Sequence, residues 1–540
     1  MADDRALVVA RRAASLAAAG GIDLPDDLAL WALASGRPDA APQPGEPEEL
    51  GALLERTTGR RTRRRLGVHF TPGGLARDLV ARAIDGHVSP TIGDPACGGG
   101  ALLLACARQL VARGEPWRDV HARLWGRDVD ALAVATCEAA LALWAGGAPV
   151  AGRCTVGDAL LEEGSWPALD VVVGNPPFLS PLSESTARPA GLAERLRGRF
   201  GDAVGPYTDA AALFLLAACR EVRPGGTVAL IQPVSVLTNR DAAAVRAAVE
   251  RLATVREVWV PSGRAFDAAV DVCVPILDRD VVDGSGGRAD RPAGAPATAA
   301  SWASHLTGPL GVPAVDLGEG SGMLGDRADV MAAFRTEYYG TVPHVHEADD
   351  LPEGRPLLTS GAIDLGGTAW GGRSARVGGR RWIRPVVDVS ALEGRAAQWV
   401  ARTAGPKLVV ATQTKVVELA VDEDGCYVAS VPLVVVRPEA GQLWHAAAAL
   451  ASPAVSAWLF QRSAGSGLSP GALRISAPVL RSVPLPVDRV AWDRGAQAFR
   501  ARDIDAFIAA MEAAYAVDPE VGAWWKERAT SVWSTGGPRR

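Results

Sequence analysis

Residues 170–178 have the sequence Asp-Val-Val-Val-Gly-Asn-Pro-Pro-Phe, and this stretch decides the fold class. Its β-branched first half is typical of a strand buried inside a parallel sheet. Asn175 and Phe178 follow directly after that strand. Ligands of open α/β sheets bind at the carboxyl ends of the strands, so the stretch predicts both a parallel sheet and a ligand site.

The turn after the strand has the chemistry of a slot for a planar nitrogen base. Asn175 offers a side-chain carbonyl acceptor, and Phe178 offers a ring face for stacking. Pro176 and Pro177 each fix φ and lack an N–H, so the Pro176 carbonyl can point at a ligand. Two acceptors suit an amino group with two hydrogens. A lone Asn-Pro-Pro turn also occurs as a simple chain reversal, so the segments before it decide the interpretation.

Short apolar segments alternate with Gly-containing turns and Ala-rich amphipathic segments between residues 90 and 277. This alternation predicts an α/β fold with a doubly wound, mostly parallel sheet and helices on both faces. The expected strands are Thr91–Asp94, Leu124–Asp128, Asp170–Gly174, Thr227–Gln232, Arg256–Val260 and Val272–Leu277.

The rest of the chain divides by composition into further parts. Residues 1–60 are predicted to be a helical N-terminal segment, and residues 61–281 the α/β domain. Residues 282–320 include a Gly/Pro/Ala-rich stretch typical of a linker. Residues 321–540 combine short β-rich pieces with helices, which predicts an α+β second domain with a helical C-terminus.

Composition excludes some classes of function. The formal net charge of −5 gives no overall attraction for a polyanion, so any nucleic-acid surface must be local. The seven cysteines form no C-x-x-C pair, so we expect reduced, buried thiols and no metal site. The N-terminal residues do not resemble a signal peptide, and no apolar run is long enough for a bilayer, so we expect a cytoplasmic protein.

A glycine-rich loop, Asp-Pro-Ala-Cys-Gly-Gly-Gly-Ala at residues 94–101, follows the first expected strand. Consecutive glycines allow backbone N–H groups to approach a ligand closely. The absence of Lys-Ser/Thr after the glycines excludes a P-loop. Asp94 would repel the pyrophosphate of a dinucleotide, whereas it suits a ligand that carries an ammonium group.

Two more carboxylates follow at later strand ends. Asp128 ends the second strand, where a carboxylate can bind both hydroxyls of a ribose, and Asp158 follows a third Val-containing segment, where it can accept from an adenine amino group. Each aspartate alone is more often a helix N-cap. Together with Asp94 they describe a nucleoside that carries an amino acid, which is S-adenosylmethionine.

Five segments in this order resemble the gamma-class N6-adenine-specific DNA methyltransferases, a group similar to the TaqI-type enzymes. They are residues 67–72 (Gly-Val-His-Phe-Thr-Pro), 94–103, 126–130, 157–161 and 175–178. The resemblance covers residues 60–280 closely and the remainder loosely. It implies a Rossmann-like class I methyltransferase fold, a C-terminal target-recognition domain, S-adenosylmethionine as the cofactor and double-stranded DNA as the partner.

The resemblance also implies roles for single residues. The expected cofactor contacts are Thr71, Asp94, Ala96, Gly98, Gly100, Asp128 and Asp158. The expected catalytic residues are Asn175, Pro176, Pro177 and Phe178, with Phe178 and Phe266 stacking on the target base. Asn175 and the Pro176 carbonyl would accept the target amino hydrogens during direct methyl transfer. The base must be flipped out of the duplex, and stacking would offset part of the cost at about 1–3 kcal/mol per base.

Basic residues gather in two places that suit DNA. One run precedes the Thr-Pro segment, at Arg56, Arg60, Arg61, Arg63, Arg64 and Arg65. A second cluster lies in the second domain, at Arg373, Arg376, Arg380, Arg381 and Arg384. Most basic runs are solvated surface, and the segments around Lys407 and Gln413 resemble strands of the target-recognition domain without showing which residues contact bases.

The function predicted from these observations is site-specific adenine methylation, in a restriction-modification or phage-defence system or as a solitary enzyme. About 60 residues precede the methyltransferase motifs and contain no Asp…Glu-x-Lys set, so we expect modification without cleavage. Two alternatives stay open: an N-methyltransferase that acts on a protein glutamine or on ribosomal RNA, and a catalytically silent DNA-binding subunit. Partner subunits of a defence system also stay open.

Overall fold

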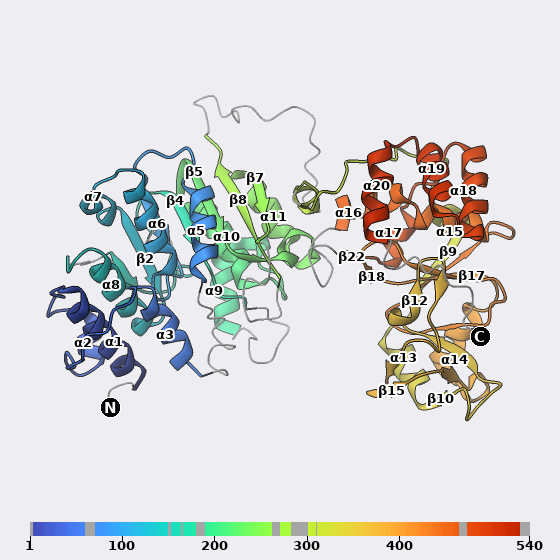
Figure 1. Ribbon diagram of the computed structural model, residues 1–540, viewed down its shortest axis with the longest axis horizontal. Helices are drawn as coiled ribbons and strands as arrows, with labels where there is room; N and C mark the ends of the chain where they lie inside the picture. The colour runs from blue at the N-terminus through green and yellow to red at the C-terminus, as the bar shows by residue number, and fades with distance from the viewer. Residues whose placement is uncertain are drawn as a thin grey trace. The chain divides into compact units, whose positions relative to one another are not determined.

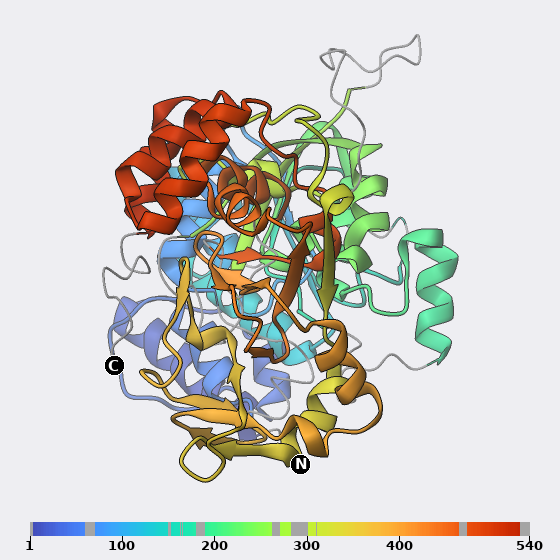
Figure 2. The same ribbon diagram turned by 90° about the vertical axis from the view of Figure 1, so that its right-hand side faces the viewer.

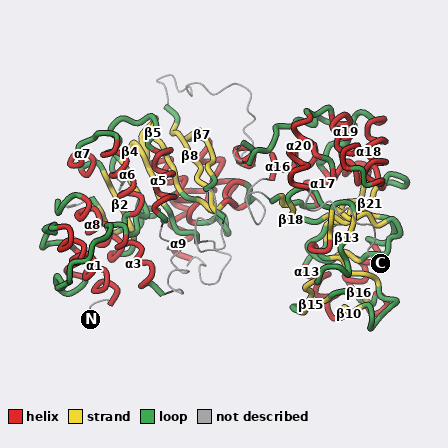
Figure 3. Tube along the Cα trace, in the orientation of Figure 1, coloured by secondary structure: helices red, strands yellow, loops and turns green. Residues whose placement is uncertain are grey.

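The computed structural model describes residues 4–59, 71–148, 153–162, 164, 166–179, 190–261, 271–281, 301–308, 310–463 and 472–529. The chain forms two compact units, Met1–Trp302 and Ala303–Arg540, called unit 1 and unit 2 below (Figure 1). Helices and strands alternate along unit 1, whereas unit 2 combines small sheets with a group of helices (Figure 3). The finer domain boundaries drawn from the sequence stay predictions.

Unit 1 is built on an eight-stranded sheet. Its strands are β1 (Ile92–Asp94), β2 (Leu124–Asp128), β3 (Cys154–Val156), β4 (Leu169–Gly174), β5 (Val222–Leu230), β6 (Gln232–Pro233), β7 (Ala253–Trp259) and β8 (Val272–Arg279). The order is β3-β2-β1-β4-β5-β8-β6, and β7 also pairs with β8. Strands β1 to β5 are parallel, while β8 is antiparallel to β5 and β7. This is the sheet of a class I methyltransferase, so the predicted fold class is confirmed.

Helices cover both faces of this sheet. They are α1 (Asp4–Gly20), α2 (Ala29–Leu33), α3 (Glu49–Thr57), α5 (Gly73–Ala83), α6 (Ala101–Ala112), α7 (Trp117–His121), α8 (Ala131–Trp144), α9 (Ala190–Phe200), α10 (Ala210–Glu221) and α11 (Ala243–Glu250). Helix α6 packs against α5 and α8, and α10 packs against α11. Val171 and Val173 of β4 belong to the core beneath the first group, and Val172, which is also fully buried, points to the opposite face because side chains alternate along a strand.

The N-terminal helices share the main core of unit 1. Ala10 of α1 and Leu50 of α3 are fully buried in the same apolar cluster as Leu79 of α5 and Leu103 of α6. Helices α1, α2 and α3 all pack against α8. Residues 4–59 therefore contribute to the core of unit 1.

Unit 2 contains two four-stranded sheets (Figure 2). The first is antiparallel and consists of β19 (Leu419–Asp422), β17 (Lys407–Val410), β21 (Val434–Pro438) and β9 (Ala328–Ala332). The second consists of β10 (Val345–Glu347), β16 (Pro385–Val387), β11 (Arg355–Leu358) and β20 (Val428–Ala429). Three two-stranded ladders complete the β structure: β12 (Ile363–Asp364) with β13 (Gly367–Thr368), β14 (Ala375–Val377) with β15 (Arg380–Trp382), and β18 (Gln413–Thr414) with β22 (Leu473–Arg474). The predicted α+β character is confirmed.

The helices of unit 2 follow mostly in its second half. They are α12 (Leu324–Arg327), α13 (Arg335–Thr341), α14 (Gly394–Arg402), α15 (Leu443–Ala451), α16 (Pro453–Ser463), α17 (Ala477–Arg481), α18 (Arg489–Ala501), α19 (Ile504–Tyr515) and α20 (Pro519–Ala529). Across the described ranges, no single helix has the length and apolarity to cross a membrane. Among the helices that the structure describes, one bent pair, α15 and α16, meets that criterion together, by length and composition alone.

Candidate active site

A cavity of about 80 Å³ lies at the carboxyl ends of β1, β2 and β4 in unit 1. It brings together six of the twelve residues that the sequence assigned to the site. Thr71, Asp94, Ala96, Gly98, Asp128 and Asn175 all line it. These residues are up to 104 positions apart in the chain, and the fold brings the strand ends together with the segment just before α5.

Asp94 ends β1 and lies at the floor of this cavity. Its side chain is only 2% exposed, and its Oδ1 accepts a hydrogen bond of 3.0 Å from the Ala96 N–H. Burial raises the pKa of Asp94 to about 8, and the nearby charge of Asp128 adds to the rise. Burial thus disfavours the ionised form of Asp94, and a cationic ligand beside the carboxylate would stabilise that form.

The glycine-rich loop has the backbone shape that only glycine adopts without strain. Gly98 has φ +50° and Gly100, the N-cap of α6, has φ +86°. Gly99 is required for a different reason, since a Cβ there would lie 2.4 Å from the Cα of Gly51 in α3. The loop therefore packs directly against the N-terminal helices. Gly100 does not itself line the cavity, so its predicted role there is conformational.

Asp128 connects the end of β2 to the glycine-rich loop. Its Oδ2 accepts from the Gly98 N–H at 3.0 Å, and its Oδ1 accepts from the Asp130 N–H at 2.9 Å. Burial raises the pKa of Asp128 above its usual range, while these two backbone hydrogen bonds act in the opposite direction. Asp130 in turn caps α8 by accepting from the Leu132 N–H. The carboxylate of Asp128 is thus fixed in the cavity wall.

Asn175 and Thr71 contact each other in the cavity lining. The Asn175 Nδ2 donates to the Thr71 Oγ1 at 3.2 Å, and Thr71 is buried immediately before α5. The hydrogen bond uses an amide hydrogen of Asn175 and not its carbonyl oxygen. Gly174, just before Asn175, is tightly enclosed, because a Cβ there would lie 2.9 Å from Leu230 Cδ2 and 3.1 Å from Asp94 Oδ1. The absence of a side chain at Gly174 allows the start of the Asn-Pro-Pro-Phe turn to lie close to Asp94.

The remaining residues of the Asn-Pro-Pro-Phe turn are positioned by packing and by a hydrogen bond to the following residue. Pro176 is buried, and Phe178 is half-buried against the main core of unit 1. The N–H of Leu179 donates to Asp209 Oδ1 at 3.2 Å, and Asp209 also caps α10. These hydrogen bonds fix the position of the chain where it leaves the turn. Phe266, the second predicted stacking residue, lies outside the described residues.

Asp158 is not among the residues that line the cavity. Its Oδ1 accepts from the Leu160 N–H at 2.9 Å, and its own N–H donates to Glu162 Oε1 at 3.2 Å. Arg127 in β2 forms an ion pair with Glu162. The carboxylate of Asp158 thus shapes a local turn after β3 and caps no helix among the described residues, and its contact with an adenine ring stays a prediction.

One wall of the cavity comes from a helix that the sequence motifs do not mark. Gly51, Leu54, Glu55 and Thr58, in and just after α3, line the cavity together with the glycine-rich loop. The only local signal is a small residue at position 51, where two backbones approach closely. Sequence motifs missed these residues because their role depends on how α3 packs.

The charge of the cavity favours a cation. Glu55, Asp94, Asp128 and Asp130 all line it, and no lysine or arginine is found among the described lining residues. S-adenosylmethionine carries a sulfonium, an ammonium and one carboxylate, so its net positive charge fits this set.

The described residues contain no group of three His, Cys, Asp or Glu side chains that could hold a metal ion. All seven cysteines are free thiols, and only Cys426 is exposed, contrary to the expectation that all are buried.

The basic residues of unit 2 fall into different environments. Arg373 forms an ion pair with Asp364 at 2.8 Å. Lys407 is fully buried and its Nζ lies 2.6 Å from Asp422 Oδ2, so it holds β17 and β19 together. Gln413 is exposed on the two-residue strand β18. Of the basic run before the Thr-Pro segment, only Arg56 is described, in the last turn of α3.

Comparison with known proteins agrees with this geometry. Residues 52–287 match the family model N-6 DNA Methylase. No curated protein matches the sequence. The type IIL restriction-modification enzyme MmeI, solved in complex with DNA, has 12% identity and a TM-score of 0.55 over 95% of this chain and 81% of that chain. This likeness shows a shared fold.

Two further solved structures are similar at lower TM-scores. The type IIG restriction endonuclease BpuSI has 12% identity and a TM-score of 0.42 over 98% of this chain and 78% of that chain. A methyltransferase subunit of a type I restriction-modification system from Streptococcus thermophilus has 21% identity and a TM-score of 0.33 over 44% and 50%. The family match and the sheet order agree: residues 52–287 are similar to the N-6 DNA Methylase family and contain the sheet of an S-adenosylmethionine-dependent methyltransferase.

Proposed function

We propose that this chain is a site-specific DNA adenine-N6 methyltransferase that modifies DNA in a restriction-modification or phage-defence system. The observation that carries the proposal is the contact between Asn175 and Thr71 in a cavity that also contains Asp94 and Asp128. This contact supports the proposal because Asn175, which would accept the amino hydrogens, lies in the lining of the cavity that would hold the cationic methyl donor.

The cavity residues would hold the cofactor by charge and by hydrogen bonds. Asp94 and the glycine-rich loop suit the amino-acid end, and Asp128 suits the ribose hydroxyls. When bound, S-adenosylmethionine supplies a methyl group on a positively charged sulfur. Asp94, whose pKa is about 8 without a ligand, would ionise fully beside the cation and release its proton.

The Asn-Pro-Pro-Phe turn would position the target base. Asn175 and the carbonyl of Pro176 would accept the two amino hydrogens of a flipped adenine, which directs the nitrogen lone pair toward the donor. The hydrogen bond from Asn175 to Thr71 fixes the amide plane, so the carbonyl oxygen presents a defined acceptor direction. Phe178 would stack on the base and offset about 1–3 kcal/mol of the cost of flipping.

We propose modification without cleavage for this chain. The support is that residues 4–59 are packed into the core of unit 1 through α1, α2 and α3. These residues therefore serve the methyltransferase fold and supply part of the cofactor cavity.

Expression in a host without DNA methylation tests the proposal. Sequencing reads that detect modified bases should show N6-methyladenine at one recurring sequence. The same host with the Asn175→Ala variant should show none, although this variant should still bind the cofactor. Unmodified DNA from the wild type would favour a protein or RNA substrate, or a silent subunit.

A further inference from the structure

A two-stranded hairpin in unit 2 carries three exposed arginines. Strands β14 and β15 place Arg376, Arg380 and Arg381 at the surface, while Ala375 and Val377 of the same hairpin are buried. The pairing register sets Arg376 directly opposite Arg381. Like charges directly opposite each other destabilise an antiparallel pair, so the hairpin has an unfavourable electrostatic arrangement unless an anion binds to it.

These arginines differ from their neighbours in sequence. Arg373 pairs with Asp364, and Arg384 pairs with Asp349 at 3.0 Å and lies over the Trp370 ring. Within the described part of the chain, Arg376, Arg380 and Arg381 form no ion pair. The structure thus separates the arginine cluster into two residues that hold the fold and three that present charge to solvent.

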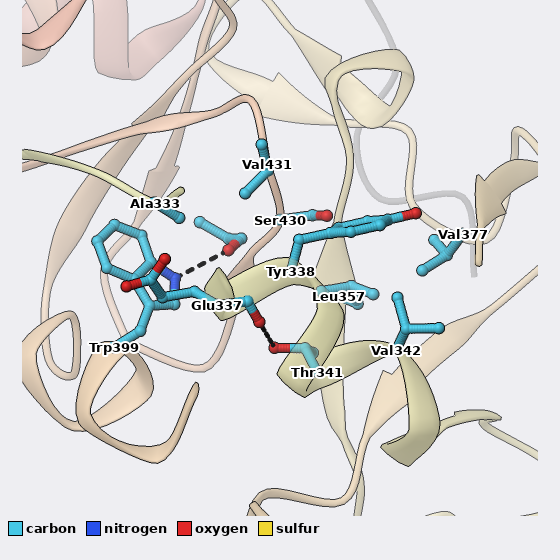
Figure 4. A pocket seen from close by; sticks show the side chains of 11 residues that line it. Ala333, Glu337, Tyr338, Thr341, Val342, Leu357, Val377, Trp399, Ser430 and Val431 are labelled. Carbon is cyan, nitrogen blue, oxygen red and sulfur yellow. Dashed lines mark hydrogen bonds between the residues drawn. The ribbon is translucent and has the colours of Figure 1, made fainter. Parts of the chain in front are cut away.

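The hairpin is rigidly attached. Its turn contains Gly378 and Gly379, both with positive φ, as a two-residue hairpin loop requires. The Gly378 N–H donates to the Tyr338 hydroxyl at 2.9 Å, and the Trp382 Nε1–H donates to the Val377 carbonyl at 3.1 Å. Figure 4 shows the Tyr338 ring extending from α13 toward Val377. A charged surface on such a support binds without a large ordering cost.

A polar groove of about 470 Å³ lies along β14. Arg335 and Arg376 line it together with the hydroxyl groups of Thr359, Ser360, Ser374 and Ser430. The described residues that line the groove include no carboxylate. The buried Oγ of Ser360 has no hydrogen-bond partner in the described structure. Hydroxyl and guanidinium donors in this combination suit the oxygens of phosphodiesters.

We propose that this arginine hairpin (residues 375–382) and the adjacent groove bind the sugar-phosphate backbone of duplex DNA. The inference rests on the proposed function, which supplies DNA as the substrate, and adds the surface that holds it. Arg376 and Arg381 contact phosphates and relieve their mutual repulsion by doing so. Contacts of this kind position the duplex independently of its sequence.

The salt dependence of DNA binding tests the proposal directly. The full chain and its Arg376→Gln/Arg381→Gln double variant are titrated with a synthetic DNA duplex of random sequence at several salt concentrations. Each lost phosphate contact lowers the slope of log K against log salt by about 0.9, so we expect a decrease of about 1.8 and an affinity loss of about tenfold or more at low salt. Arg494→Gln, at an exposed position on α18, should leave both quantities unchanged.

Three controls make the outcome decisive. The double variant should bind S-adenosylmethionine like the wild type and should melt at the same or a higher temperature, since the substitutions remove a like-charge pair. An unchanged salt slope would overturn the inference, as would an affinity loss confined to one recognition sequence. If the wild type methylates DNA while the double variant binds it normally, only the hairpin assignment fails. If the wild type neither binds nor methylates DNA, the proposed function fails.

Discussion

The Asn175 amide donates to the hydroxyl of Thr71 across 104 positions of sequence, and this 3.2 Å hydrogen bond joins the target segment to the start of α5. It connects the residue that would bind the substrate amino group with a residue that lines the cofactor cavity. If the proposed function is correct, this hydrogen bond couples the position of the target-binding residue to that of the cofactor cavity.

Replacing Thr71 with valine should lower turnover more than it weakens cofactor binding. The variant keeps the shape of the side chain but removes the acceptor for the Asn175 amide, so the amide loses its fixed plane. A misplaced reacting group typically costs about 100-fold in rate. Single-turnover methylation measures the rate, and calorimetry measures S-adenosylmethionine affinity. Thr71→Ser keeps the hydroxyl and should restore most activity; equal rates for the valine and serine variants would refute this role.

Gly174→Ala should destabilise the protein and weaken cofactor binding. The new Cβ would lie 2.9 Å from Leu230 Cδ2 and 3.1 Å from Asp94 Oδ1, so the strand end must shift. Overpacking of this kind costs about 1–3 kcal/mol in the free energy of unfolding. Gly191→Ala is the control, because a Cβ there meets nothing within 4 Å and α9 should gain about 0.5–1 kcal/mol of stability. Equal denaturation midpoints for the two variants would contradict the account.

The pKa of Asp94 predicts a pH dependence for the free protein. Burial raises this pKa from 3.8 to about 8, so between these values the folded state keeps a proton that the unfolded state has lost. The free energy of unfolding should therefore fall as the pH rises through this window, and the decrease should end above pH 8. Asp94→Asn should remove that component of the slope in urea titrations at several pH values. A variant with the wild-type slope would show that Asp94 is ionised throughout.

Cofactor binding should have the opposite dependence on pH. A cationic ligand favours ionised Asp94, so affinity should rise with pH up to about 8, and binding at neutral pH should release a proton. Calorimetry in buffers of different ionisation enthalpy measures that proton. No release at neutral pH would place the cation away from Asp94.

Glu55→Gln should weaken S-adenosylmethionine binding although α3 lies before the recognisable motifs. The side chain lines the same cavity as Asp94 and Asp128, and loss of one charged contact costs about tenfold in affinity. Thermal shift and calorimetry measure the change without any need for turnover. Glu520→Gln, at an exposed position on α20, is the matched control. Unchanged affinity in the Glu55 variant would show that α3 packs against the cavity without contributing to cofactor binding.

The sequence predicted those parts of the structure that local chemistry specifies. The β-branched run ending at Gly174 predicted β4, and the glycines after Asp94 predicted the loop before α6, because strand propensity and glycine conformations are properties of adjacent residues. Six predicted residues do line one cavity: Thr71, Asp94, Ala96, Gly98, Asp128 and Asn175.

The features that the sequence did not predict depend on tertiary contacts. The cavity wall formed by α3 depends on the close approach of Gly51 and Gly99. No local sequence pattern predicts that these two glycines are in contact. The arginine cluster of unit 2 looked uniform until the structure paired Arg373 with Asp364. Lys407, in a segment that resembles a recognition strand, is buried against Asp422. Partners distant in sequence decide whether a charge supports the fold or faces a ligand.

The most direct test of the central claim is methyl transfer by purified protein with DNA and isotopically labelled S-adenosylmethionine, followed by mass spectrometry of the nucleosides. The proposed mechanism predicts labelled N6-methyladenine with the wild type, and none with Asn175→Ala, which should bind the cofactor with wild-type affinity. Labelled N6-methyladenine at the wild-type rate from Asn175→Ala, or label on another base with the wild type, would contradict it.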